Sequence, residues 1–307
     1  MAGEIVRRPD LEQMQVAFPD YIGNIVYPWL GKPQVSGTIY YQKYKDDIAI
    51  QENRNTAALG DITQTVIAGN SFTFACHELR ARIAMGYTER ISYSDNEHAD
   101  MAQGRMAKRA YFNKIETLCA TNLFKADGAI DGTADPVATI DTNVSLLRDA
   151  GIGRVALVLS NHNKVLLKNN EIIRDRMKST GVGVYSLEDI RNLGDIQLAA
   201  ALGVDTVLTM RDQIGYAGVT GASKDMAALV VLADEYTEPS ETIQYARLVY
   251  FQYTDSADDR FCVESFVNPL NDSFVVDCKG LVELKELNPE LKKTIRIFNN
   301  NSDSVSA

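Results

Sequence analysis

The side chains best suited to catalysis in this chain are three histidines, His77, His98 and His162, which lie far apart in the sequence. They form no His-Glu-x-x-His zinc motif. His162 is the most suggestive, because the apolar run 155–159 leads into the segment 161–178, and a helix N-terminus after a strand often holds an anion. No acid or base partner accompanies it. We therefore interpret 161–178 as a helix whose apolar side packs on a sheet, with His162 at its start.

Other patterns that could bind a ligand are incomplete. The glycine-rich segment 215–223 lacks the Gly-x-x-x-x-Gly-Lys sequence of a phosphate loop, and the segment after it is typical of a strand. The neighbouring acids Asp46–Asp47 and Asp258–Asp259 are typical of solvated turns, and no second acidic cluster completes a metal cage. There is no Gly-x-Ser-x-Gly elbow. The sequence predicts no catalytic, cofactor or metal site, and hence no enzyme.

Cysteine spacing and composition narrow the class of protein further. The cysteines, Cys76, Cys119, Cys262 and Cys278, form no Cys-x-x-Cys pair and are predicted to be buried free thiols in a reducing cytoplasm. The formal net charge of -10 disfavours nucleic-acid binding through a basic surface, although one locally basic face remains compatible with it. The N-terminus has no signal-like apolar core, and no apolar stretch approaches the roughly 20 residues of a membrane span.

A long helix is the clearest local prediction. Ser94 and Glu97 have the spacing of a capping box, and the next proline is Pro136. Apolar residues follow helical spacing through 107–123. About 30 residues at about 1.5 Å each give a rod of about 45 Å, enough to cross a domain of this size. We expect this helix to be the spine of the molecule.

Residues 35–76 are predicted to form a long β-hairpin. Segments 35–44 and 62–76 are rich in Ile, Val, Thr, Tyr and Phe, and the tip between them is polar and charged. A hairpin of this length is marginally stable alone in water. It therefore needs a partner surface, which another chain can supply.

The segment before the hairpin is predicted to be an extended arm. Residues 1–34 hold four of the eight prolines, together with bulky side chains such as Tyr21, Tyr27 and Trp29. These apolar groups need burial against this chain or a neighbouring one.

The rest of the chain has two parts that differ in their pattern of predicted strands and helices. Residues 135–240 alternate short strands and helices, with strands expected at 135–140, 154–160, 205–210 and 226–234, and helices at 142–152, 161–178 and 196–204. A second capping pattern lies at 186–189. This alternation is typical of an α/β layer, whereas 243–298 is mostly strands, including separate ones at 273–278 and 280–287.

This order of elements resembles the major capsid proteins of tailed bacteriophages, which share the HK97-like fold. The stretches that carry the resemblance are VAFPDYIGNIVYPWLGKPQVSGTIYYQKY, RVALVLSNHNKVLLKNNEIIRDRMK, LAAALGVDTVLTM and SFVVDCKGLVELKEL. They are similar, in order, to the family's arm and extension loop, the strand and helix that open its axial domain, the helix-strand unit that follows, and the closing strands of its peripheral domain. The family shares architecture more than sequence motifs.

The resemblance implies an α+β fold with a defined set of domains. They are an N-terminal arm (1–34), an extension-loop hairpin (35–76), a peripheral domain (77–141 and 241–299) with the spine helix at 95–124, an axial domain (142–240) and a flexible tail (300–307). It further implies hexamers and pentamers of this chain, closed into an icosahedral head around double-stranded DNA held by non-specific contacts. The location is the virion, after assembly in the host cytoplasm.

The partners and contact residues follow from the same resemblance. A scaffolding protein, a portal and a head-maturation protease are expected partners, whereas a fused scaffolding domain and a covalent crosslink through Lys43 or Lys45 are not expected. Aromatic residues are enriched at protein interfaces. The residues predicted to contact neighbouring subunits are Tyr27, Trp29, Tyr40, Tyr41, Lys43, Tyr44, Asp46, Asp47 and Arg54.

Two other functions remain open at this point. An encapsulin-like compartment would use the same fold around an enzyme cargo. An α/β enzyme or small-molecule binding protein would use 151–235 as its ligand layer. Closed shells seen by microscopy, or a monomer with saturable ligand binding, distinguish the shell proteins from the enzyme.

Overall fold

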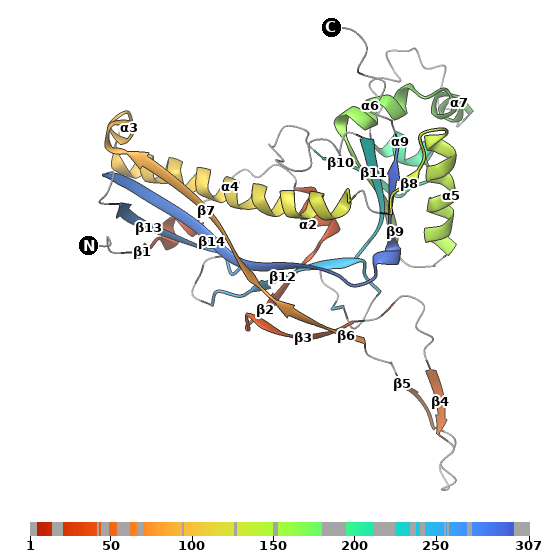
Figure 1. The fold of residues 1–307 in the computed structure, drawn as a ribbon, viewed down its shortest axis with the longest axis horizontal. Coiled ribbons are helices and arrows are strands. Elements are labelled where there is room, and N and C mark those ends of the chain that lie inside the picture. Colours follow the sequence, from red (N-terminus) through yellow and green to blue (C-terminus); the bar gives the residue numbers. More distant parts are fainter. Residues whose placement is uncertain are drawn as a thin grey trace.

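The computed structural model describes residues 5–13, 21–41, 43, 49–53, 62–66, 70–93, 95–125, 128–149, 153–179, 195–210, 225–233, 238–239, 243–254, 256, 258–268 and 272–297. Within them the chain forms a six-stranded sheet, a five-stranded sheet and two ribbons of two strands each. Figure 1 shows the two sheets side by side, with the ribbons extending away from them.

The six-stranded sheet gathers strands from both ends of the sequence. Its order is β1–β13–β14–β12–β2, and β7 pairs with β14. All of these pairings are antiparallel except that of β2 with β12. The bounds are β1 (Val6–Arg7), β2 (Trp29–Lys32), β7 (His77–Gly86), β12 (Ala246–Phe251), β13 (Cys262–Asn268) and β14 (Ser273–Glu286). The two strands expected at 273–278 and 280–287 are thus one continuous strand.

The predicted spine helix is confirmed as α4 (Asn96–Leu123), which lies along β7 and β14 (Figure 1). Its first residue follows Asp95, whose Oδ1 accepts a hydrogen bond from the His98 amide at 2.7 Å. Asp95 is therefore the N-cap, one residue later than the predicted Ser94. The one-turn helix α3 (Tyr87–Ile91) joins β7 to this spine.

The expected extended arm is instead folded into the molecule. The short helices α1 (Pro9–Gln13) and α2 (Ile22–Val26) pack against α4, while β1 and β2 are strands of the six-stranded sheet. Apolar burial explains this arrangement, because Leu11, Tyr21 and Val26 are all buried within the main core.

The five-stranded sheet has the order β10–β9–β11–β15–β8. Its strands are β8 (Ile130–Asp131), β9 (Arg154–Ser160), β10 (Thr206–Met210), β11 (Met226–Leu232) and β15 (Lys292–Arg296), and the 3₁₀ turn η1 (Pro289–Leu291) precedes β15. The helices α5 (Pro136–Asp149), α6 (Asn161–Asn169), α7 (Glu171–Ser179) and α9 (Asp195–Ala201) surround it in Figure 1.

The strand β15 differs from the expectation for the C-terminal strands. Residues 292–296 were expected with the peripheral strands, but β15 pairs with β11 and β8 in the other sheet. After β14 the chain therefore returns to the five-stranded sheet. The buried side chains of both sheets form one continuous core.

Two predictions for the α/β layer are wrong, namely the strand at 135–140 and the single helix at 161–178. Residues 135–140 form the start of α5 rather than a strand, because Val137, Ile140 and Val144 repeat at helical spacing and are buried on one side. Asp135 Oδ1 accepts from the Ala138 amide at 3.0 Å, and Pro136 occupies the first helical position.

The helix expected at 161–178 is broken in two. Asn170 has an extended conformation, with φ -66° and ψ 133°, and separates α6 from α7. The expected apolar side is only partly correct, since Val165 is 50% and Ile172 42% exposed. Leu167 and Ile173 are the residues that fill the core.

Candidate subunit-contact surfaces

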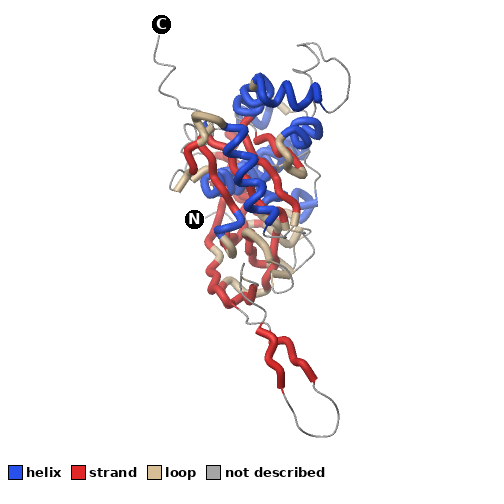
Figure 2. Tube along the Cα trace, turned by 90° about the vertical axis from the view of Figure 1, so that its right-hand side faces the viewer, coloured by secondary structure: helices blue, strands red, loops and turns tan. Residues whose placement is uncertain are grey.

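The expected hairpin consists of two antiparallel ribbons. The strands β3 (Ser36–Tyr41) and β6 (Asn70–Ala75) pair from Ser36 opposite Ala75 to Tyr41 opposite Asn70. Farther out, β4 (Ala49–Asn53) pairs with β5 (Ile62–Val66). Figures 1 and 2 show the outer ribbon projecting well beyond the two sheets. The hairpin therefore offers its strands to a surface outside this chain's own body.

The root of the hairpin is anchored by a small apolar cluster of its own. Ile39 and Phe74 are buried with Leu30, Cys76 and Val249. On the opposite side of β3, Tyr40 is 62% exposed. The ribbon is thus fixed at its base on one face and presents an aromatic side chain to solvent on the other.

The predicted contact residues differ in how far the structure exposes their side chains. Tyr27 is fully buried within its own chain, so its side chain is not exposed to a neighbouring subunit. Its hydroxyl donates to Asn122 Oδ1 at 2.6 Å, and burial raises the pKa of this phenol. Trp29 is half-buried, with its ring 5.4 Å from that of Tyr250 and the Arg260 guanidinium 5.4 Å from its centre.

The remaining predicted residues belong to the hairpin. Tyr40 and Lys43 are exposed, and Tyr41 is half-buried with its ring 5.8 Å from that of Phe72. These three are available for contact with a second chain. The other four, Tyr44, Asp46, Asp47 and Arg54, lie outside the described residues.

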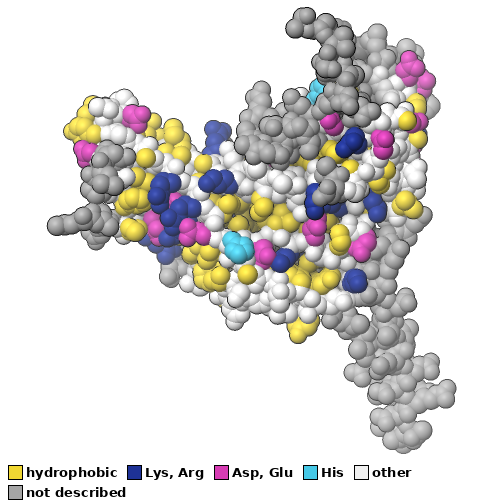
Figure 3. Space-filling view, in the orientation of Figure 1, with side chains coloured by type: hydrophobic (Ala, Val, Ile, Leu, Met, Phe, Trp, Pro, Cys, Tyr) yellow, Lys and Arg dark blue, Asp and Glu magenta, His cyan; other side chains and the backbone are white. Residues whose placement is uncertain are grey.

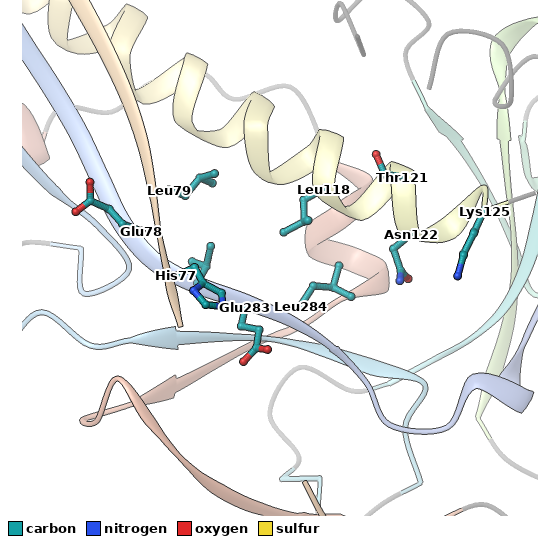
Figure 4. A pocket seen from close by; sticks show the side chains of 10 residues that line it. His77, Glu78, Leu79, Leu118, Thr121, Asn122, Lys125, Glu283 and Leu284 are labelled. Atoms are coloured by element: carbon teal, nitrogen blue, oxygen red, sulfur yellow. The ribbon is translucent and has the colours of Figure 1, made fainter. Parts of the chain in front are cut away.

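A groove that the sequence did not reveal lies between the C-terminal half of α4 and the strands β7 and β14. Its volume is about 540 Å³. Leu79, Leu118 and Leu284 meet in it from the three elements, as Figure 4 shows, and Leu118 is 39% exposed. The groove is also lined by His77, Glu78, Thr121, Asn122, Lys125, Val282 and Glu283.

The groove lies beside the hairpin root. Glu283 Oε2 accepts a hydrogen bond from the Ala75 amide at 2.6 Å, where β6 ends and β7 begins. Figure 3 shows apolar side chains at the surface of this face among scattered charged ones. No local signal could have identified the groove, because Leu284 comes from a segment more than 150 residues after Leu79 and Leu118.

Comparison with known proteins decides the fold. No protein-family profile and no curated protein matches the sequence. A phage-related protein from Bordetella bronchiseptica RB50 matches the structure with a TM-score of 0.65 and 13% identity, covering 95% of this chain and 97% of the other. The capsid of the cyanophage P-SCSP1u matches with a TM-score of 0.56 and 7% identity, over 94% and 91%. The capsid of Ralstonia phage GP4 matches with a TM-score of 0.52 and 9% identity, over 91% and 89%. The chain has the HK97-like capsid fold.

The HK97-like fold confirms the mixed α+β class that the sequence resemblance implied. The matches extend over nearly the whole chain, so the α/β layer and the spine helix belong to one structural unit and not to an appended ligand domain. At these identities the likeness concerns the fold alone.

On this HK97-like chain, the described residues provide little for catalysis. They contain no cluster of three or more metal-ligating side chains, and none of their helices is long and apolar enough to cross a membrane. The three histidines lie on separate elements: His77 on β7, His98 on α4 and His162 on α6. All four cysteines are free and buried, as predicted.

Proposed function

We propose that this protein is the major capsid protein of a tailed phage, which assembles into hexamers and pentamers of an icosahedral head. The observation that carries the proposal is the near-complete structural match to phage capsids, covering 94% of this chain in one case and 91% in another. The six-stranded sheet with α4 would be the peripheral domain, the five-stranded sheet with its helices the axial domain, and residues 35–76 the extension loop.

The hairpin supports assembly on physical grounds. A two-stranded ribbon is marginally stable alone, because it buries little apolar surface. The pair β4–β5 projects beyond the body of this chain (Figure 2), so its partner surface would be on a neighbouring subunit. Contacts of this kind link each copy to the next and close a shell through symmetry.

The groove beside α4 is the surface we propose for such a contact. Replacing Leu118 with Asp would put a charge among Leu79 and Leu284, and it should reduce assembly while leaving the subunit folded. Met106 on the same helix is 49% exposed and does not line the groove, so Met106→Asp is a matched control. Equal assembly by both variants would show that the groove is not a contact surface.

Double-stranded DNA is the proposed content of the head. With a net charge of -10, the chain would contact DNA weakly and without sequence specificity, which suits a container that must later release its content. A scaffolding protein, a portal and a maturation protease are the further proposed partners, and the virion is the proposed location.

The experiment that tests the function is electron microscopy of the purified full chain. We expect closed shells, and a monodisperse monomer or small oligomer under all assembly conditions would contradict the proposal. Deleting residues 46–60 should give a soluble, folded subunit that does not form shells, whereas deleting 300–307 should leave assembly intact. Shells isolated from the native host that hold a protein cargo instead of DNA would indicate an encapsulin-like compartment.

A further inference from the structure

The carboxylate of Glu116 is buried at the junction between the spine helix and the N-terminal segment. The residue is 4% exposed. Its two oxygens accept hydrogen bonds from the first amides of α2, from Ile22 at 3.1 Å and from Gly23 at 2.7 Å. The approach is so close that a Cβ added to Gly23 would lie 2.6 Å from Glu116 Oε2. The side chain thus ties α2 directly to α4.

No cation compensates this buried carboxylate among the described residues, where it has neither a salt bridge nor a coulombic contact with a basic group. The titratable groups that interact with it electrostatically are the Tyr27 phenol and the Cys119 thiol. Behind Tyr27, the Tyr245 hydroxyl donates to the Glu286 carboxylate at 2.7 Å. The strands β10 and β11, which also pack against α2, carry no charged side chain.

The position of α2 gives this contact a consequence for the rest of the chain. The helix leads directly into β2, which pairs with β12, and then into β3 at the root of the hairpin. Holding α2 on the spine therefore fixes the start of the segment that leads to the hairpin. Release of α2 would loosen that segment and, through β2, its pairing with the edge of β12.

We propose that Glu116 is a proton-controlled latch that holds α2, and with it the base of the hairpin, on the spine helix. Protonation removes the cost of keeping an unpaired charge away from water, and one carboxyl oxygen still accepts an amide hydrogen bond. Ionisation restores that cost, and moving the carboxylate into water relieves it. The latch is independent of the proposed shell function, because it rests only on contacts within one chain.

The direction of the pH effect follows from linkage. Burial raises the pKa of Glu116 from 4.5 to about 7, against the two amide hydrogen bonds, which lower it. Docking of α2 is therefore fully favoured below pH 4.5 and weakens as the pH rises through about 7. From the direction and size of this shift, the population with α2 released should rise about 10- to 100-fold between about pH 5 and pH 8.

Hydrogen–deuterium exchange of the full chain tests the latch. After correction for the intrinsic exchange rate, the protection of peptide 21–27 should fall about 10- to 100-fold from about pH 5 to pH 8. In Glu116→Gln the protection should be independent of pH, because the amide does not titrate. Glu97 lies on the exposed face of the same helix, so Glu97→Gln should keep the wild-type profile.

Three results would overturn the proposal. They are pH-independent protection of 21–27 in the wild type, an unchanged pH profile in Glu116→Gln, and an equal loss of protection in peptide 140–148 of α5. The last would show that the whole subunit opens rather than α2 alone. Because the wild-type profile is itself decisive, the test stands even when the Gln variant folds poorly.

Discussion

Gly280 offers the sharpest test of how the spine helix packs on the sheet. It lies within β14, where a Cβ would be 2.1 Å from Tyr111 Oη, 2.9 Å from Tyr111 Cζ and 2.8 Å from the Arg260 carbonyl oxygen. Tyr111 is fully buried, and its ring lies 5.4 Å from that of Phe112 and 5.8 Å from that of Phe261. The phenol therefore has no free space into which it can withdraw. Gly280→Ala must displace either the ring or the strand.

The expected change in the free energy of unfolding has three contributions. Overpacking a dense core costs about 1–3 kcal/mol, and disturbing the 3.4 Å hydrogen bond from the Tyr111 hydroxyl to Arg260 adds about 0.5–1 kcal/mol. The lower entropy of the unfolded Ala chain offsets about 0.4–1 kcal/mol. We expect the free energy of unfolding to fall by roughly 2 kcal/mol.

Urea unfolding of the unassembled subunit, followed by circular dichroism, measures this change. In a Tyr111→Phe background the nearest ring atom is Cζ at 2.9 Å, so the same substitution should cost about 1 kcal/mol less. Gly86→Ala is the control, because a Cβ there meets no atom within 4 Å. A cost below about 0.5 kcal/mol for Gly280→Ala, or an equal cost in both backgrounds, would refute the packing argument.

Three further predictions follow from local contacts. The Ser160 hydroxyl is the N-cap of α6 and accepts a hydrogen bond from the Asn163 amide at 3.1 Å. Ser160→Ala should therefore lower the free energy of unfolding in urea by about 1 kcal/mol. No loss of stability would mean that water replaces the cap. Asn122→Ala should cost about 1–3 kcal/mol, because its Oδ1 accepts from the Tyr27 hydroxyl at 2.6 Å. Tyr27→Phe should then cost less in that background than alone. The four buried thiols, two of which have a pKa raised by burial to about 11, should resist Ellman's reagent in the native protein and react in guanidinium; rapid native labelling would contradict their burial.

Regular local patterns were reliable guides to structure in this chain. The long helix was predictable because apolar residues recur at helical spacing over 107–123 and no proline interrupts them. The strands of the hairpin and of β13 are rich in residues that favour extended backbone, and β9 and β11 contain continuous apolar runs. The wrong prediction at the start of α5 has a local cause too. The β-branched residues at 137–140 favoured a strand, but the cap at Asp135 and burial of one side produced α5.

The contact surfaces were far less predictable than the elements. The aromatic content of the arm indicated burial correctly, but not whether the burial would be within the chain or against a neighbour. Tyr27 is buried by Asn122 and Tyr245, which lie 95 and 218 residues away in sequence. The groove at Leu118 depends in the same way on β14.

The sequence by itself determined the types of most elements, the free state of the cysteines and the family to which the order of elements is similar. These properties depend on short-range periodicity, on spacing and on the order of segments, all of which can be read along the chain. Only the tertiary structure decided that β15 joins the second sheet, that α2 is tied to Glu116, and that a groove opens beside the hairpin root. Each of these depends on which distant segment supplies the partner for a strand edge, an amide or an apolar face, and that choice is made by the packing of the whole core.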